Sequence, residues 1–97
     1  MITLSGTTET PLASTYLDRL CRHFAKKISV EHDETTGHAR FPFGECRLEA
    51  GDTALHFHCR ADDSASLEKI MDVIERHVWM FTKRNPLTVT WEEPQSH

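Results

Sequence analysis

The first regular pattern along the chain is a helical one, predicted to run from about residue 11 to residue 27. Apolar residues recur there with the spacing i, i+3, i+4 and i+7, at Ala13, Leu17, Leu20, Cys21, Phe24 and Ile28. Thr10 followed by Pro11 is typical of a helix start, with Thr as the N-cap and Pro at the first helical position. Residues 2–9 alternate weakly and are rich in Thr and Ser, which predicts a short edge strand before the helix.

Between residues 29 and 61 the period of the apolar positions changes from 3.6 to 2, which predicts strands. A turn over residues 34–37 would form a first hairpin, with Glu31 opposite Arg40 on the polar side and apolar residues on the other. This pairing of opposite charges supports the proposed register, because a slip of one residue would move every side chain to the other face.

A second hairpin is predicted around a tight turn at Gly51 and Asp52. Its two strands alternate apolar and polar residues, and the two-residue turn would place Glu45 opposite His58 on the polar face. Between the hairpins, residues 41–44 read FPFG. Pro cannot donate a hydrogen bond to a ladder and Gly can bend, so a corner is predicted there.

A second helix begins at Asp63 or Ser64, either of which can serve as N-cap. Its apolar stripe consists of Leu67, Ile70, Met71, Ile74, Val78 and Phe81. Residues 83–86, KRNP, are typical of a helix end. Residues 87–91, LTVTW, alternate and predict a last strand, and the tail EEPQSH is expected to be frayed.

The predicted order is therefore strand, helix, four strands, helix, strand, in a single α+β domain covering residues 1–97. Two amphipathic helices on one face of an antiparallel sheet would bury all three apolar surfaces. This layout is similar to TATA-box-binding-protein-like and helix-grip folds, an analogy that carries no function. The other sheet face would carry Glu31, Arg40, Glu45, Arg47, His56, His58 and Arg60.

Composition narrows the classes of function. The net charge of −4 argues against general nucleic-acid binding, which needs a basic face. No apolar run approaches the ~20 residues that cross a bilayer, and the N-terminus has no secretory signal pattern. The cysteine count of three is odd and no CxxC occurs. We therefore expect a cytoplasmic protein with reduced thiols, bound neither to a membrane nor to nucleic acid.

Residues 16–50, YLDRLCRHFAKKISVEHDETTGHARFPFGECRLEA, resemble the bacterial domain-of-unknown-function 2218 family. The segments that carry the resemblance are LCRHFAKK, FPFG and the later IERHVWMFTKRNPLTVTWE. It implies a compact α+β domain without an established activity. Some relatives lie next to flavin-dependent siderophore-interacting reductases, which implies a role near iron acquisition and a reductase partner. The family often has a second His near Lys26 or Lys27, and its absence here counts against a two-histidine metal or haem site on this helix.

The first candidate site lies on one flank of the first helix. Tyr16, His23 and Lys27 share that flank, with His23 about 105° from the centre of the apolar face. These groups suit a small anionic ligand such as a carboxylate, catecholate or phosphate. In the alternative interpretation they only rim the junction of helix and sheet. Phe41 and Phe43 either wall a ligand pocket at the corner or pack into the core.

Two further candidates come from the sheet and the second helix. His56 and His58 point the same way from one strand, and with Glu45 they would form a ligand set for a first-row metal. Ordinary cross-strand pairs of these side chains are the alternative. Trp79 and Met80 lie off the apolar stripe, so they either mark a partner surface or pack against the first helix or the last strand.

An enzyme is the less favoured class. Cys21 and His23 are two residues apart on a helix and do not face each other, and periodicity brings together no nucleophile with a base. We expect no cofactor. The sequence favours a non-catalytic binding or accessory domain, linked to iron or siderophore metabolism through the resemblance. The alternative is a protein-interaction module that forms a homodimer or docks a reductase without a small ligand.

Overall fold

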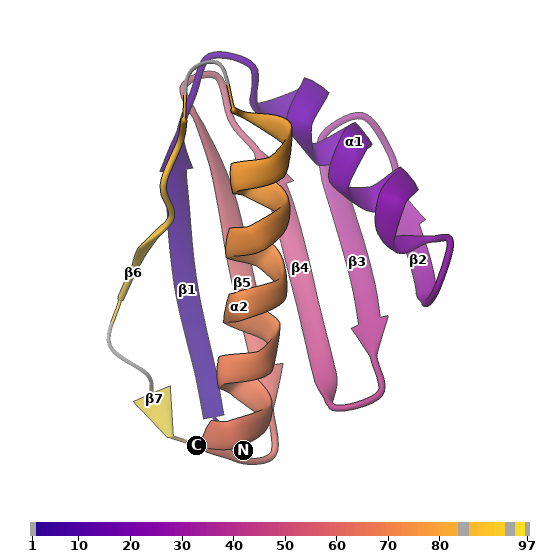
Figure 1. The fold of residues 1–97 in the computed structure, drawn as a ribbon, viewed down its shortest axis with the longest axis vertical. Helices are drawn as coiled ribbons and strands as arrows, with labels where there is room; N and C mark the ends of the chain where they lie inside the picture. The colour runs from indigo at the N-terminus through magenta and orange to yellow at the C-terminus, as the bar shows by residue number, and fades with distance from the viewer. Residues whose placement is uncertain (1, 84–85, 93–94, 97) are drawn as a thin grey trace.

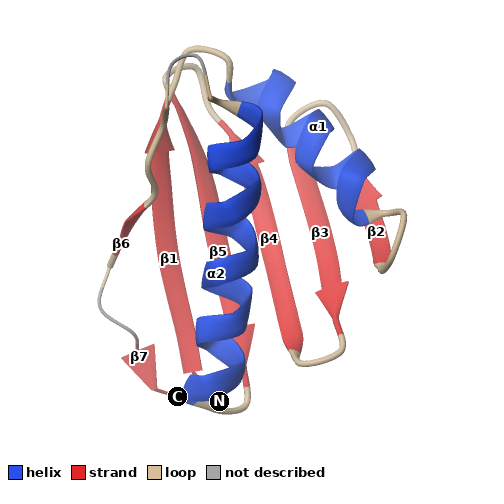
Figure 2. Ribbon diagram, in the orientation of Figure 1, coloured by secondary structure: helices blue, strands red, loops and turns tan. Residues whose placement is uncertain are grey.

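The computed structural model describes residues 2–83, 86–92 and 95–96. Figures 1 and 2 show its seven strands and two helices. In chain order they are β1 (Ile2–Glu9), α1 (Ala13–Phe24), β2 (Ser29–His32), β3 (Thr36–Phe41), β4 (Gly44–Ala50), β5 (Ala54–Ala61), α2 (Ser64–Phe81), β6 (Thr90–Trp91) and β7 (Gln95–Ser96).

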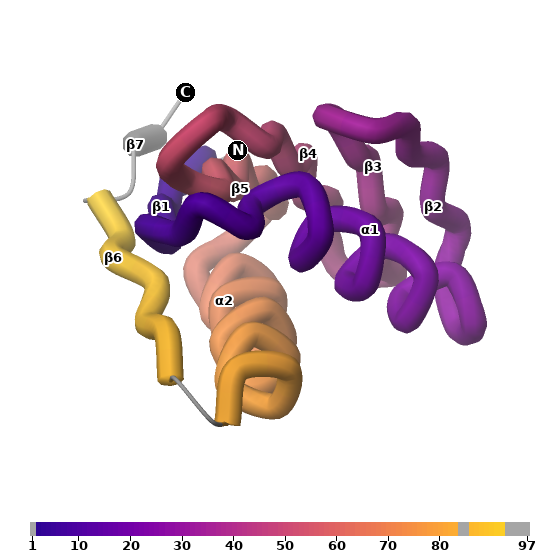
Figure 3. The backbone as a smooth tube through the Cα atoms, turned by 90° about the horizontal axis from the view of Figure 1, so that it is seen from above, coloured from indigo at the N-terminus to yellow at the C-terminus, as the bar shows by residue number. Residues whose placement is uncertain are grey.

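The strands form one antiparallel sheet in the order β2-β3-β4-β5-β1-β6, and β7 also pairs with β1. Figure 3 shows both helices on the same side of this sheet. Helix α1 packs over β2 to β5, whereas α2 packs over β4, β5 and β1. The predicted α+β class, the order of elements and the placement of both helices on one face are confirmed.

The core fills the space between the helices and the inner face of the sheet. Phe57 of β5 is fully buried there, together with Leu17 of α1 and Ile70 of α2. Strands β1, β4 and β5 contribute alternate residues, so that their other side chains point to the uncovered face. Within the described residues, neither helix combines the length and apolar content that a membrane crossing requires.

Strand β1 lies inside the sheet, and its prediction as a short edge strand is wrong. All eight of its residues pair with β5, and its other side pairs with β6 and β7. Gly6 allows this arrangement, because a Cβ at that position would lie 2.5 Å from Cε3 of Trp91. The pairing joins the two ends of the chain, which no local pattern in residues 2–9 could indicate.

Helix α1 is shorter than predicted at both ends. It begins at Ala13, and Leu12 rather than Thr10 occupies the N-cap position. The Thr10 hydroxyl accepts a hydrogen bond from the Leu12 N–H at 3.1 Å, so it stabilises the turn before the helix. The helix ends at Phe24, and residues 25–27 form a turn instead of its last helical residues.

Both hairpins are shifted by two from the predicted registers. Glu31 lies opposite His38, and Glu45 lies opposite Arg60. The second turn is centred one residue later than expected, and the Gly51 N–H donates to the Ala54 carbonyl at 2.8 Å. Because side chains alternate with a period of two, this even shift changes the partners but leaves every side chain on its predicted face.

The FPFG segment is a hairpin turn rather than a corner. Phe41 pairs with Gly44, and Pro42 and Phe43 form the tip that joins β3 to β4. A Cβ on Gly44 would lie 2.5 Å from the carbonyl oxygen of Arg60, so the close approach of backbone to backbone here requires glycine. The strands β2 to β5 therefore form one continuous antiparallel meander.

The start of α2 is confirmed, since Asp63 is the N-cap and its Oδ1 accepts the Ser66 N–H at 2.7 Å. The helix ends at Phe81. The predicted stop signal at Arg84 and Asn85 lies outside the described residues. Of the predicted strand 87–91, only Thr90–Trp91 forms a ladder. The prediction of a frayed tail is wrong for Gln95–Ser96, which pairs with β1.

Candidate functional site

The predicted ligand flank of α1 is only partly formed. Tyr16 is half-buried and packs against the hydrophobic core. His23 is also half-buried, near the C-terminal end of the helix. Lys27 is exposed and lies beyond the last helical residue, so the helical geometry that would align it with the other two does not reach it.

His23 has a partner that the sequence analysis missed. Its ring lies 4.6 Å from the ring of His77 of α2, between centroids, and 5.8 Å from that of Phe81. The Val73 carbonyl can only accept, so His77 donates its Nδ1–H to it at 2.6 Å. The Nε2 of a neutral His77 therefore carries the lone pair. His77 precedes the buried Val78 on α2, but only the packing of the helices reveals that it faces α1.

The surroundings of His23 disfavour its charged form. Burial lowers the pKa of His23, and the neighbouring His77, Lys26 and Lys27 lower it further. At neutral pH the ring is therefore uncharged and would not supply positive charge to an anion. This lowered pKa weighs against the anion-binding interpretation of the flank.

Phe41 and Phe43 extend the ring cluster toward the β3–β4 turn. Their rings stack with 5.5 Å between centroids, and Phe41 also meets Phe24 edge to face at 5.6 Å. Phe24 in turn lies 5.0 Å from His77. The rings pack against the core, as one alternative predicted, and they also border an open hollow of about 660 Å³ at the start of α2, while their role in a ligand pocket stays a prediction.

The predicted metal ligands do not converge. The Oε2 atom of Glu45 lies 2.9 Å from Nε2 of His38, and its other oxygen lies 3.7 Å from Arg60. The hydrogen bond with His38 lowers the pKa of the Glu45 carboxyl. The expected position of Glu45 opposite His58 is wrong, because the register shift places Arg47 there.

The two strand histidines bond to hydroxyl groups of β1. Nδ1 of His56 lies 3.3 Å from the Thr7 hydroxyl, and Nδ1 of His58 lies 3.1 Å from the Ser5 hydroxyl. Within the described residues, no group of three or more His, Cys, Asp or Glu side chains is placed to hold a metal ion. The cross-strand alternative therefore describes this face of the sheet.

An apolar groove runs between α2 and the returning segment 86–89. Its volume is about 650 Å³. Its apolar lining comes from Val78, Trp79, Met80, Leu87 and Val89. Its charged lining comes from Asp72, Glu75, Arg76 and Lys83. Trp79 is 58% exposed and Met80 is 40% exposed, so neither packs away against α1 or β6. The alternative in which this pair packs away is therefore wrong, and the partner surface stays a prediction.

Polar contacts tie α2 to the segment that forms the other wall of the groove. The buried Thr82 hydroxyl donates to the Val78 carbonyl at 2.7 Å and accepts the Leu87 N–H at 3.1 Å. Nearer the middle of the helix, the indole Nε1–H of Trp91 donates to Glu75. The ammonium group of Lys83 lies 5.2 Å from the ring centroid of Trp79. The contacts of Thr82 and Trp91 thus fix the two walls of the groove relative to each other.

Comparison with known proteins assigns the family. The model of the family described as "Uncharacterized protein conserved in bacteria (DUF2218)" matches residues 5–92. The chain belongs to this DUF2218 family. A search among curated proteins finds no match. The NMR structure of PA4090 from Pseudomonas aeruginosa is similar, with a TM-score of 0.83 and 25% identity over 99% of this chain and 100% of that one.

The cysteines of this DUF2218 domain are buried and free. Burial raises the pKa of Cys21 to about 11 and also raises that of Cys46. Cys46 lies directly opposite Cys59, with 3.6 Å between the sulfur atoms. Protonated thiols inside a core are poor nucleophiles, and these thiols pack as small apolar residues.

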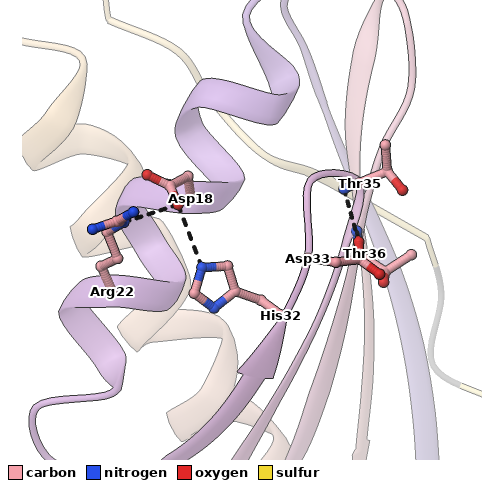
Figure 4. Close-up of polar contacts among 6 residues, drawn as sticks. All are labelled: Asp18, Arg22, His32, Asp33, Thr35 and Thr36. Atoms are coloured by element: carbon pink, nitrogen blue, oxygen red, sulfur yellow. Dashed lines mark hydrogen bonds and ion pairs between the residues drawn. The ribbon is translucent and has the colours of Figure 1, made fainter.

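Another polar cluster of the DUF2218 domain fastens its edge strand (Figure 4). The Asp18 carboxylate accepts hydrogen bonds from Nε of Arg22 at 2.9 Å and from Nε2 of His32 at 3.3 Å. The hydrogen bond from Arg22 holds the Asp18 pKa below its usual value. Since Asp18 belongs to α1 and His32 to β2, the cluster joins these two elements, and we assign it a structural role.

Proposed function

We propose that this protein is a non-catalytic binding domain that docks another protein surface in the groove beside α2. The observation that carries the proposal is the exposure of Trp79 and Met80 at the edge of an apolar hollow. Large apolar side chains gathered in one place mark interaction sites on otherwise polar surfaces. Aromatic residues and Met are enriched in the centres of protein interfaces, and Trp is among the commonest hot-spot residues.

The chemistry of the other candidate groups supports a role without catalysis. The Cys21 thiol is buried with a raised pKa, so it is protonated at neutral pH. The rings that His23 contacts, those of His77 and Phe81, carry no hydroxyl or thiol that an imidazole base could activate. The charged side chains of the groove are engaged with neighbours, as in the ion pair of Asp72 with Arg76 at 2.8 Å.

A narrower proposal places the domain near iron or siderophore metabolism, with a ligand at the ring cluster. It rests on the resemblance to a family of which some members lie next to siderophore-interacting reductases. It also rests on the rings of His23, Phe41 and Phe43, which are joined through Phe24 and His77. Flat aromatic ligands such as catecholates would stack on such rings. Titration with ferric iron, ferrous iron, haem and a ferric-catecholate mimic tests it. Binding weaker than about millimolar by a folded sample would reject this narrower proposal.

Site-specific photocrosslinking tests the docking proposal. A photoreactive phenylalanine analogue placed at Met80 should give a defined crosslinked product in cells of the chain's own source, formed either with a second copy of the chain or with another protein. Trp79→Ala in the same chain should abolish this product. Leu12 provides a matched control position, because it is 53% exposed and lies at the start of α1, outside the groove lining. Equal products from positions 80 and 12, or no product from position 80, would contradict the proposal.

A further inference from the structure

We infer that the surface docked in this groove is the same groove of a second copy of the chain, related by a two-fold axis that passes beside α2 at the level of residues 77 and 78. The inference rests on the proposed function and names its partner. It follows from the order of charges along the groove and from the position of the exposed ring. A two-fold interface brings one patch against itself, so the patch must complement its own reversed copy.

The charges of the groove lining are segregated along α2. Asp72 and Glu75 come first along the groove lining, near the middle of α2, whereas Arg76 comes next and Lys83 follows the C-terminal end of the helix. Positions 72 and 81 are about 14 Å apart at the rise of an α-helix, and Lys83 follows two residues after the end of the helix. Two antiparallel copies centred between residues 77 and 78 therefore place Asp72 against Lys83 of the partner subunit, and they do so twice.

The same alignment pairs the other groups of the lining. Arg76 lies opposite the partner's Trp79, where its guanidinium can pack against the indole ring. Glu75 lies opposite the partner's Met80, and its carboxylate already accepts the Trp91 N–H of its own chain. The two exposed apolar side chains, Trp79 and Met80, thus each face a residue of the partner, and no carboxylate is placed against another carboxylate.

A parallel arrangement of the two helices is disfavoured by the same residues. It would bring Asp72 against the partner's Asp72 and Lys83 against the partner's Lys83, which is repulsive at both ends. The antiparallel arrangement exchanges both repulsions for attractions. The ion pair of Asp72 with Arg76 inside one chain remains compatible with it, because a carboxylate can accept from two donors.

Lys83 also prepares the central anchor of the interface. Its ammonium lies 5.2 Å from the centre of the Trp79 ring within the same chain. A ring already held by this contact loses less conformational freedom when it is covered. The groove is small for an interface, so we expect a dimer with a dissociation constant of about micromolar or weaker.

Charge reversal tests the inference, with sedimentation velocity from about 1 to 500 μM as the measurement. Asp72→Lys and Lys83→Asp should each weaken self-association by at least about tenfold, because each creates two repulsive contacts. An equimolar mixture of these two variants should recover a dimer, and so should the chain that carries both substitutions. Glu68→Lys is the matched control, since Glu68 is an exposed carboxylate on α2 outside the groove lining.

Three results would overturn the dimer. They are a folded wild-type monomer throughout this range, single variants that associate like the wild type, and a mixture that stays monomeric. Circular dichroism checks folding, and Trp79→Ala gives a second test if a charge variant fails to fold. A monomer that still yields a different crosslinked protein from position 80 would overturn the dimer alone. A monomer without that product would overturn the docking function as well.

Discussion

At the scale of single residues, backbone approach decides which positions require glycine. We predict that Gly44→Ala lowers the free energy of unfolding by about 1–3 kcal/mol, because the new Cβ would lie 2.5 Å from the Arg60 carbonyl oxygen. Gly51→Ala is the matched control, since a Cβ at Gly51 would lie 3.4 Å from its nearest atom, the Ala54 carbonyl oxygen. Urea denaturation measures both. If Gly51→Ala lowered the free energy of unfolding as much as Gly44→Ala, the result would contradict the steric argument.

The histidine pair predicts a dependence of stability on pH. The pKa of His23 is lowered in the folded protein by burial and by His77, Lys26 and Lys27. The unfolded chain therefore binds a proton first as the pH falls. The stability that neutral His23 contributes is fully present above the pKa of histidine in the unfolded chain, about 6.5. It is lost as the pH falls through the lower pKa of His23 in the folded protein. Stability should consequently decline on acidification before the carboxyl groups titrate.

Substitution of His23 tests this dependence. His23→Gln should flatten the decline in unfolding free energy between about pH 6.5 and pH 5, because Gln does not titrate. His58→Gln is the control, since His58 lies on the uncovered face of the sheet, away from the helix pair. Urea denaturation at several pH values provides the measurement. A His23→Gln profile that parallels the wild type would show that the pair does not carry the effect.

At the scale of elements, the start of α2 depends on one side chain. Asp63→Ala removes the carboxylate that accepts the Ser66 N–H at 2.7 Å, and should lower the free energy of unfolding by about 1 kcal/mol. Asp62→Ala is a close control, because it removes the same charge one residue earlier without removing the cap. Thermal unfolding followed by circular dichroism compares the two. Losses of the same size would mean that charge rather than capping is responsible.

The elements also mark how far periodicity could predict the candidate sites. Periodicity placed Glu45 and His58 on the correct face. The predicted pairing of the two residues was wrong, because the turn after β4 is centred one residue later than expected. Face and partner are separate properties of a strand. The predicted metal site required Glu45 to lie opposite His58, but in the observed register Arg47 lies opposite His58.

At the scale of the whole molecule, the thiols report on the integrity of the core. Cys21, Cys46 and Cys59 come from three elements and are all at most 1% exposed. We predict that none reacts with a charged disulfide reagent in the native protein, and that all three react together on global unfolding. The absorbance of the released thiolate, followed against urea, tests this. Rapid labelling of one thiol in native buffer would reveal local opening around it.

The groove is likewise a property of the assembled molecule. Trp79 and Met80 could be recognised as lying off the apolar stripe of α2, and the structure shows that they remain uncovered. The second wall comes from segment 86–89, which Thr82 holds beside the helix. The predicted strand 87–91 would have suggested regular pairing there. Only Thr90–Trp91 pairs with β1, which leaves Leu87 and Val89 to line the hollow.

The sequence by itself determined the elements of this protein apart from β7, the faces that they bury and the start of α2 at Asp63 or Ser64, because these properties depend on periodicity and on local hydrogen bonds. The tertiary structure decided the inward place of β1, the registers of both hairpins, the contact of His23 with His77 and the open groove at Trp79. Each of these joins residues from different elements. A period of two or of 3.6 carries no information about such contacts, since it describes one element at a time.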